Sequence, residues 1–193
     1  MRKYLIPSIP MAHVPGLILF CVLGCLIAGT YGVIHDQVTY SIGPEYFTQF
    51  KYEQFKWANF GWSDRFFVGC IGFLATWWVG LIVAWILTRR MLPNQSFSVA
   101  AKKILAGFGV VFLTGFATGA IGYGYGLYLG PEADYSRYDE AFEAIGVTDA
   151  WAFLRVAYIH NAGYLGGLIG LVLTFFLIRP GEESDAELPN SEA

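Results

Sequence analysis

The sequence predicts an all-α integral membrane protein with four transmembrane helices. Hydrophobic residues make up 55% of the 193 residues and charged residues only 14%, against about 25% in a typical soluble domain. A chain of this length could not bury so much apolar surface in water, so we expect lipid to solvate much of it. Four apolar stretches are long enough to cross a bilayer, and every aspartate and glutamate lies outside them.

A helix needs about 20 apolar residues to cross the hydrocarbon core of a bilayer, which is about 30 Å thick. The second stretch ends at Arg89 and Arg90, and the fourth ends before Arg179. Asp149 is placed to cap the fourth helix, which we expect to project above the bilayer. The predicted spans are residues 14–34, 66–88, 104–129 and 151–178.

The four spans are predicted to form one transmembrane domain, residues 1–180. Residues 181–193 read GEESDAELPNSEA, an acidic segment without aromatic side chains, and we expect a disordered tail there. The net charge of −3 and the lack of clustered Lys and Arg argue against a nucleic-acid partner. The expected partner is the lipid bilayer, with other membrane subunits or a second copy of the chain left open.

The distribution of Lys and Arg predicts that both termini are cytoplasmic. Basic residues concentrate in the short segments that face the cytoplasm. With this orientation the inner segments hold seven basic residues, and the longer outer segments hold five. The inner basic residues are Arg2, Lys3, Arg89, Arg90, Lys102, Lys103 and Arg179.

Glycines recur at four-residue intervals in the third and fourth spans. This spacing lets helix backbones approach closely, and helices in lipid associate through such packing. We expect the third and fourth helices to touch along these faces, although the same faces would suit a second subunit. The glycines concerned are Gly115, Gly119, Gly122, Gly126, Gly163, Gly167 and Gly170.

The first outer loop is expected to contain an amphipathic helix. Pro44 suits the first position of a helix, and Glu45 suits its positive end. In a helical projection, aromatic side chains from Tyr46 to Trp57 gather on one arc and charged side chains on the other. This pattern is typical of a helix that lies in the membrane interface.

His35 and His160 are expected at the same depth, near the outer boundary of the bilayer. His35 directly follows the first apolar stretch, and His160 lies about 20 residues before Arg179. A polar side chain inside a membrane span is a candidate functional residue by default. The candidate ligand or polar cluster comprises His35, Asp36, Arg155, Tyr158, His160 and Asn161.

Three interpretations of this cluster stay open. In the first it is structural: His160 and Asn161 hydrogen-bond to a neighbouring helix. Asp36 then pairs with Arg155 or Arg65. In the second it binds a transition metal or a haem, because imidazole and carboxylate suit Zn, Cu, Fe or Ni. The candidate metal ligands are His35, His160, Asp36 and Glu45. In the third it binds or passes a small molecule, a quinone or an ion.

The segment HDQVTYSIGPEYFTQFKY, which starts at His35, resembles a stretch of uncharacterised bacterial four-span membrane proteins that carry an HDQxTY...PEYFT pattern. The resemblance covers about one tenth of the chain and implies a multi-pass protein of the bacterial inner membrane. It also implies that the segment from His35 to Phe47 is important. The group has no assigned activity, so the resemblance implies no reaction.

The sequence has no nucleophile motif, no phosphate-binding glycine loop and no zinc-protease pair, and it leaves open whether the protein is an enzyme. We expect a binding, accessory or assembly component with an outward-facing polar site. One alternative is a membrane oxidoreductase subunit that binds haem or a metal through His35 and His160. The other alternative is a small transporter or channel.

Overall fold

The chain folds into four long helices in a computed structural model that describes residues 9–181. All four helices are long and apolar enough to cross a membrane, and residues 9–181 contain no strand. The predicted all-α membrane fold is therefore confirmed. The predicted basic residues at positions 2 and 3 and the acidic tail from residue 182 onward lie outside the described residues. The long helices are α2 (Val14–Ile42), α4 (Asp64–Met91), α5 (Phe97–Leu129) and α7 (Ala150–Leu177).

Three of the four helices, α2, α4 and α5, extend beyond their predicted apolar stretches, most of all at the far end of α2. The apolar run of α2 ends at Ile34, but the helix continues through His35 and Asp36 and ends at Ile42. Its 29 residues make it about 43 Å long, whereas the hydrocarbon core is about 30 Å thick. Hydropathy identifies only the apolar part of a helix, so the predicted spans of α2, α4 and α5 are shorter than the helices.

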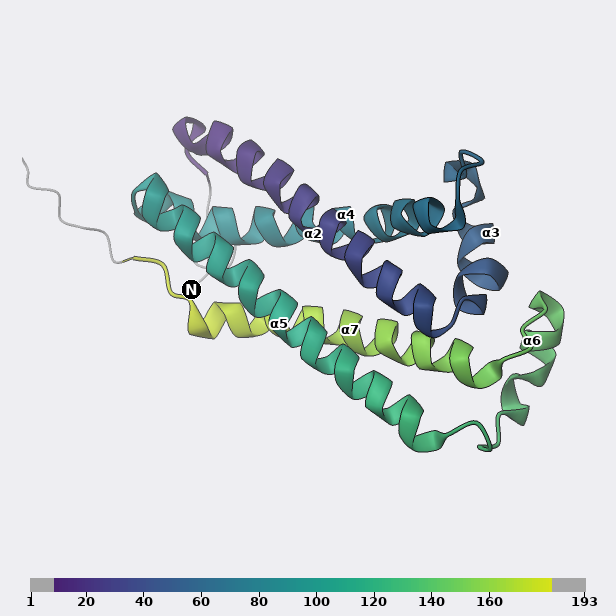
Figure 1. Cartoon of the computed structure of the whole chain (residues 1–193). Helices are drawn as coiled ribbons and strands as arrows, with labels where there is room; N and C mark the ends of the chain where they lie inside the picture. The colour runs from purple at the N-terminus through teal and green to yellow at the C-terminus, as the bar shows by residue number, and fades with distance from the viewer. Residues whose placement is uncertain (1–8, 182–193) are drawn as a thin grey trace, which may run out of the picture.

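The four helices form two closely packed pairs, α2 with α4 and α5 with α7 (Figure 1). In the first pair, Gly24 lies against Gly80, and a Cβ added at Gly24 would be 2.6 Å from the Gly80 carbonyl oxygen. Gly32 and Gly72 make a similar backbone contact. The first pair was not predicted, although Gly24 and Gly32 stand eight residues apart and therefore share a helix face.

The second pair uses most of the glycines that the sequence analysis identified. A Cβ added at Gly122 would be 2.5 Å from the carbonyl oxygen of Tyr158. Gly167 differs, since a Cβ there would meet nothing within 4 Å, and the adjacent Gly166 faces α5 instead. Of the predicted glycines, those that face the partner helix within this chain are Gly115, Gly119, Gly122, Gly126, Gly163 and Gly170.

The two pairs meet at both ends of the bundle. One end carries both termini of the described chain and the connection between α4 and α5, η4 (Leu92–Asn94). We name it the inner end, and the opposite end the outer end, after the predicted orientation. At the inner end, Arg90 donates a hydrogen bond of 2.7 Å to the carbonyl of Phe175. The core at this end includes Phe20, Leu87, Met91, Ile104 and Phe108. At the opposite, outer end the core includes Tyr46, Phe47, Phe142, Phe153 and Val156.

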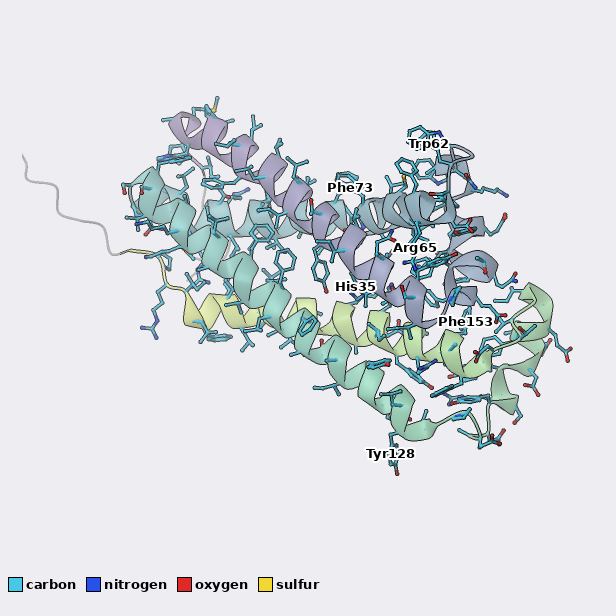
Figure 2. All side chains as sticks on the ribbon, viewed as in Figure 1. His35, Trp62, Arg65, Phe73, Tyr128 and Phe153 are labelled. Atoms are coloured by element: carbon cyan, nitrogen blue, oxygen red, sulfur yellow. The ribbon has the colours of Figure 1, made fainter. Side chains whose placement is uncertain are left out.

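The first outer loop is helical from Tyr46 to Gln54, in the region predicted for an amphipathic helix, but its first six residues form a π-helix. Tyr46 and Phe47 are buried against α7, whereas Trp57 and Trp62 are exposed, and Trp62 projects beside the outer end of α4 (Figure 2). The apolar side of the first half of the loop therefore covers the ends of the helices, because their side chains offer a nearer apolar surface than lipid. The loop consists of the π-helical η2 (Tyr46–Lys51), α3 (Tyr52–Gln54) and the 3-10 helix η3 (Lys56–Ala58).

The second outer loop contains η5 (Ser136–Tyr138) and α6 (Asp139–Ile145). It leads into α7 at Asp149, whose carboxylate accepts a hydrogen bond of 2.9 Å from the backbone N–H of Ala152. The predicted cap of the fourth helix is confirmed. A side-chain oxygen at this position satisfies one of the backbone donors that a helix start leaves without a partner.

We expect Gly122→Ala to lower the free energy of unfolding by about 1–3 kcal/mol, because the added Cβ would press on the backbone of Tyr158. Gly124→Ala is the matched control, since a Cβ at Gly124 would meet nothing within 4 Å. Thermal unfolding of both purified variants in one detergent measures the difference. Equal stability of the two variants would show that close packing at Gly122 is not required.

Candidate metal centre

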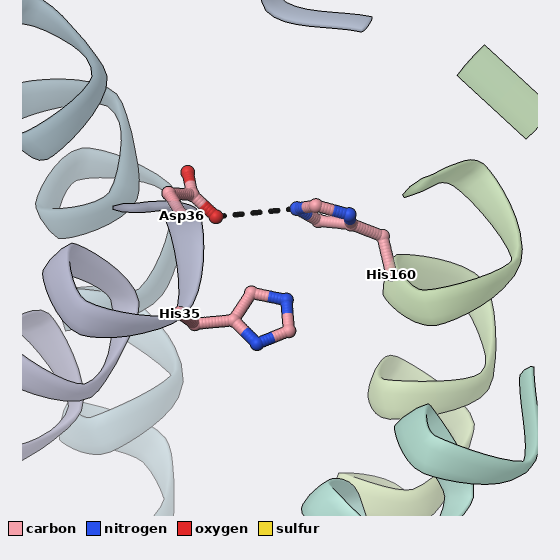
Figure 3. Close-up of side chains that lie close together, drawn as sticks. All are labelled: His35, Asp36 and His160. Atoms are coloured by element: carbon pink, nitrogen blue, oxygen red, sulfur yellow. Dashed lines mark hydrogen bonds and ion pairs between the residues drawn. The ribbon is translucent and has the colours of Figure 1, made fainter. Parts of the chain in front are cut away.

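Two histidines and one carboxylate meet between the two helix pairs (Figure 3). His35 and Asp36 lie on α2, and His160 lies on α7. Nε2 of His160 is 3.2 Å from Oδ1 of Asp36, and the ring centroids of His35 and His160 are 4.9 Å apart. One ligand atom from each of the three residues lies within 4.8 Å of the other two. Both Asp36 and His160 are buried, with 5% and 4% of their surface exposed.

The continuation of α2 beyond its apolar part brings these residues to α7. The helix stays regular through this region, and the Thr39 hydroxyl donates to the His35 carbonyl. At the end of α2, Gly43 lies against the backbone of Ala152 of α7. A residue with a side chain at that position would push the two helices apart, so Gly43 permits the close approach that Asp36 needs to reach His160.

The hydrogen bonds of His160 give its two ring nitrogens different roles. Nδ1 is 2.9 Å from the carbonyl oxygen of Val156, and a carbonyl only accepts, so Nδ1 carries a hydrogen. In a neutral imidazole the Nε2 lone pair then points at the Asp36 carboxylate. Two such acceptors attract each other only when a proton or a cation lies between them. The contact therefore favours a bound positive charge.

Aromatic rings surround the two histidines. Tyr46 from η2 stacks on His160 with centroids 4.9 Å apart, and Tyr31 from α2 stacks on His35 at 5.6 Å. Tyr164 approaches His160 from one turn along α7, at 6.1 Å. These rings restrict the orientation of the imidazoles and keep bulk water away from the site.

Lys51 is a neighbour of this site that the sequence analysis missed. Its ammonium group lies over the rings of Tyr46 and Phe50, 5.7 Å and 5.1 Å from their centroids. Burial lowers the pKa of Lys51 below its ordinary value, and the negative charge of Asp36 opposes the shift. The spacing of Tyr46 and Lys51 belongs to the π-helical turn of η2, which an α-helical projection does not detect.

Glu45, which we considered as a metal ligand, is not part of the cluster. Its carboxylate accepts hydrogen bonds from the backbone N–H groups of Thr148 and Asp149, at 2.8 Å and 2.9 Å, and from the Thr148 hydroxyl at 2.5 Å. These bonds connect the first outer loop to the start of α7, across more than 100 residues of sequence. Glu45 therefore joins two loops and has no free oxygen directed at the histidines.

Three other members of the predicted cluster also lie elsewhere. Arg155 packs on Trp151, and Tyr158 stacks edge-to-face with Tyr125 of α5, with centroids 5.1 Å apart. Asn161 is exposed on the surface of the bundle. At about 100° per residue, these positions fall on faces of α7 that differ from the face of His160.

The predicted pairing of Asp36 with an arginine is wrong. Arg65 instead donates to the carbonyl of Gln37 at 2.8 Å and to the Ser41 hydroxyl at 3.0 Å. It thereby ties the start of α4 to the last turns of α2. Its place at the α2 end is visible in Figure 2. The partner of Asp36 is His160 of α7.

The donor set suits a divalent transition metal. Two imidazoles and one carboxylate match the ligands of many zinc sites and of the facial triad that binds non-haem iron. Two ligand atoms about 2.1 Å from one ion in tetrahedral geometry are about 3.4 Å apart. The separation of 3.2 Å between Nε2 of His160 and Oδ1 of Asp36 is close to this value. The ligand atom of His35 lies within 4.8 Å of the other two, so the His35 ring would have to move closer to complete the set.

The hydrogen bonds to Glu45 make stability depend on pH. Burial alone would raise the pKa of Glu45, but the hydrogen bonds from Asp149 and Thr148 outweigh it and lower the pKa below the ordinary value of 4.5. The resulting stabilisation is present above pH 4.5 and is lost as the pH falls through the lower, folded-state pKa. We expect thermal stability in detergent to decrease in that acid range, and Glu45→Gln to weaken the decrease. An unchanged acid dependence in Glu45→Gln would contradict this role.

Comparison of the chain with models of protein families, with curated proteins and with solved structures found no match. The resemblance of the segment from His35 to Phe47 to bacterial four-span proteins therefore stays a prediction. The interpretation of the site depends on its geometry and its donor atoms alone.

Proposed function

We propose that this protein is a multi-pass protein of the bacterial inner membrane that binds one divalent transition-metal ion through His35, Asp36 and His160. In this proposal it serves as a binding or accessory component rather than as a channel. The observation that carries the proposal is the meeting of three metal-ligating side chains within 4.8 Å between two helix pairs. A neutral His160 ring whose lone pair faces the buried Asp36 carboxylate is costly unless a proton or a cation lies between them.

The presence of three rather than four protein ligands favours an ion that can leave the site and be replaced. Structural zinc sites use four protein ligands, whereas sites with three protein ligands keep a position for water or a substrate. Among residues 9–181, only His35, Asp36 and His160 form a group of this kind. Zinc and ferrous iron are the ions that two imidazoles and a carboxylate suit best.

A haem fits the two histidines less well than a single ion. Two axial histidines hold a haem iron from opposite faces of the macrocycle, so the macrocycle lies between the rings. The rings of His35 and His160 are in edge-to-face contact, with centroids 4.9 Å apart. This contact leaves no space for a macrocycle, and an oxidoreductase role would have to use a directly bound metal.

A transporter or channel receives less support. Toward the inner end from the site, Tyr31 stacks on Phe112 at 5.0 Å, and Phe112 contacts Phe108 at 5.9 Å. These rings fill the region between α2 and α5 with aromatic carbon. The Tyr31 hydroxyl is the single polar group of these three side chains, too few to replace the hydration of an ion on its way through the membrane.

The orientation proposed from Lys and Arg puts the site on the periplasmic side. Arg89, Arg90, Lys102, Lys103 and Arg179 all belong to the inner end of the bundle, and Lys103 donates to the carbonyl of Arg179 at 2.9 Å. The clustering of basic residues at one end supports a cytoplasmic location for that end. The site lies toward the opposite end, where a periplasmic ion could reach it.

Metal binding can be tested directly on the purified full-length protein. We expect Zn²⁺ to bind with a stoichiometry of about one, and His160→Ala or Asp36→Asn to weaken binding on the order of a hundredfold or more, because each removes a ligand. Titration calorimetry and elemental analysis measure affinity and stoichiometry. His13→Ala is the matched control, since it removes a histidine that precedes α2 at the inner end. Equal binding by wild type and His160→Ala would contradict the site.

Topology can be tested by labelling single cysteines in cells, in a variant whose three native cysteines are replaced by alanine. Ser136 and Ser96 are exposed and lie in connections at opposite ends of the bundle. We expect a membrane-impermeant reagent to label Ser136→Cys in intact spheroplasts, and Ser96→Cys only after the inner membrane is opened. The reverse pattern would overturn the proposed orientation.

A further inference from the structure

Arg155 is a charged side chain in α7, one of the helices long and apolar enough to cross a membrane, and no acidic side chain of residues 9–181 forms an ion pair with it. Among residues 9–181, the ion pairs are Lys56 with Glu53 and His160 with Asp36. The Nε atom of Arg155 is buried and has no hydrogen-bond partner among the described residues. Asp149, six residues earlier in the chain, uses its carboxylate to cap α7. A guanidinium in this environment requires an anion from outside the described chain.

The surroundings of Arg155 hold its side chain in a defined orientation. Its guanidinium carbon lies 3.7 Å from the ring centroid of Trp151, and the indole N–H of Trp151 donates to the carbonyl of Gly126 at 2.8 Å. A Cβ added at Gly126 would be 2.6 Å from Cγ of Arg155. The glycine therefore provides the space that the arginine occupies between α5 and α7.

Further donors lie beside Arg155. Tyr158 is three residues further along α7 and so on a neighbouring part of the helix surface. Tyr158 interacts with the side chains of Arg137 and Tyr138 from the second outer loop. Arg137 also lies over the ring of Tyr138, 4.4 Å from its centroid. The guanidinium of Arg137 and the hydroxyl of Tyr138 thus lie beside Tyr158, which is one helical turn from Arg155 on α7. We call these four residues, Arg137, Tyr138, Arg155 and Tyr158, the arginine–tyrosine patch.

The depth of the patch identifies the anion. About 33 Å of helix separates Arg155 from Leu177 at the inner end of α7, slightly more than the thickness of the hydrocarbon core, about 30 Å. The guanidinium therefore lies where the headgroups of the outer leaflet begin. Arginine binds phosphate oxygens in a bidentate manner, and phenol hydroxyls add single hydrogen bonds. Phospholipid phosphates are the abundant anions at this depth.

We propose that the arginine–tyrosine patch binds the phosphate group of an outer-leaflet phospholipid, with Arg155 as the main ligand and Arg137 and Tyr158 as additional donors. The lipid would fill the position beside α5 and α7, on the far side of α7 from the metal centre. The proposal does not depend on metal binding at His160.

Native mass spectrometry of the full-length protein tests the proposal. The protein is released from nanodiscs that contain phosphatidylglycerol, or from matched nanodiscs in which diacylglycerol replaces part of the phospholipid. We expect retained phosphatidylglycerol with the wild type, and Arg155→Gln to reduce its apparent affinity by about tenfold, as expected for the loss of a charge-assisted contact. Lys56→Gln, at an exposed ion pair in the first outer loop, is the charge-matched control.

Tyr158→Phe removes only a hydroxyl. It therefore tests the patch even if Arg155→Gln fails to fold. We expect Tyr158→Phe to retain less phosphatidylglycerol than the wild type while its thermal stability without lipid is unchanged. Retention of diacylglycerol and phosphatidylglycerol to the same extent, or equal retention by the wild type and Arg155→Gln, would overturn the proposal. Binding of inorganic phosphate that depends on Arg155 and displaces no lipid would assign the patch to a soluble phosphate and overturn the lipid assignment.

Discussion

Contact between helix backbones at glycine is the constraint on which the rest of this structure depends. Lipid tails are as apolar as leucine, so the hydrophobic effect does not bring helices together inside a bilayer, and close packing must do so. Gly24 and Gly32 of α2 meet α4 in this way, and Gly122 and Gly126 of α5 meet α7. Each pair is consequently a stiff unit. The contact region between the two pairs, which we call the joint, is where polar side chains from different pairs can meet.

The candidate metal centre occupies that joint. Asp36 comes from one pair and His160 from the other. The packing of helices within each pair therefore sets the position of its ligand residue. The outer loops hold the joint closed: Glu45 connects the first loop to the start of α7, and Tyr46 stacks on His160. An ion bound to both helices would add to this connection. In the proposed metal-bound form, occupancy and the docking of the two pairs would therefore be linked in energy.

α7 carries both of the proposed sites, on different faces. His160 points toward α2, and Arg155, five residues earlier, lies against Gly126 of α5. Five residues correspond to a rotation of about 140° around the helix, which separates a buried site between the pairs from a site at the lipid boundary. The two residues also differ by about 7.5 Å along the helix axis. In the proposed arrangement, His160 is buried between the helix pairs and the Arg155 guanidinium lies among headgroups.

The sequence by itself determined the class of fold, the number of spans and the glycine faces of α5 and α7, because these follow from the composition and spacing of single segments. It also indicated that His35 and His160 share one depth, since depth depends on the number of residues from a membrane boundary. Only the tertiary structure decided that α2 packs on α4, that Glu45 joins two loops, and that Arg155 turns toward α5. These features depend on which face of each helix meets its neighbour. Hydropathy indicates the position of a residue along the membrane normal. It contains no information about the rotation of a helix about its own axis.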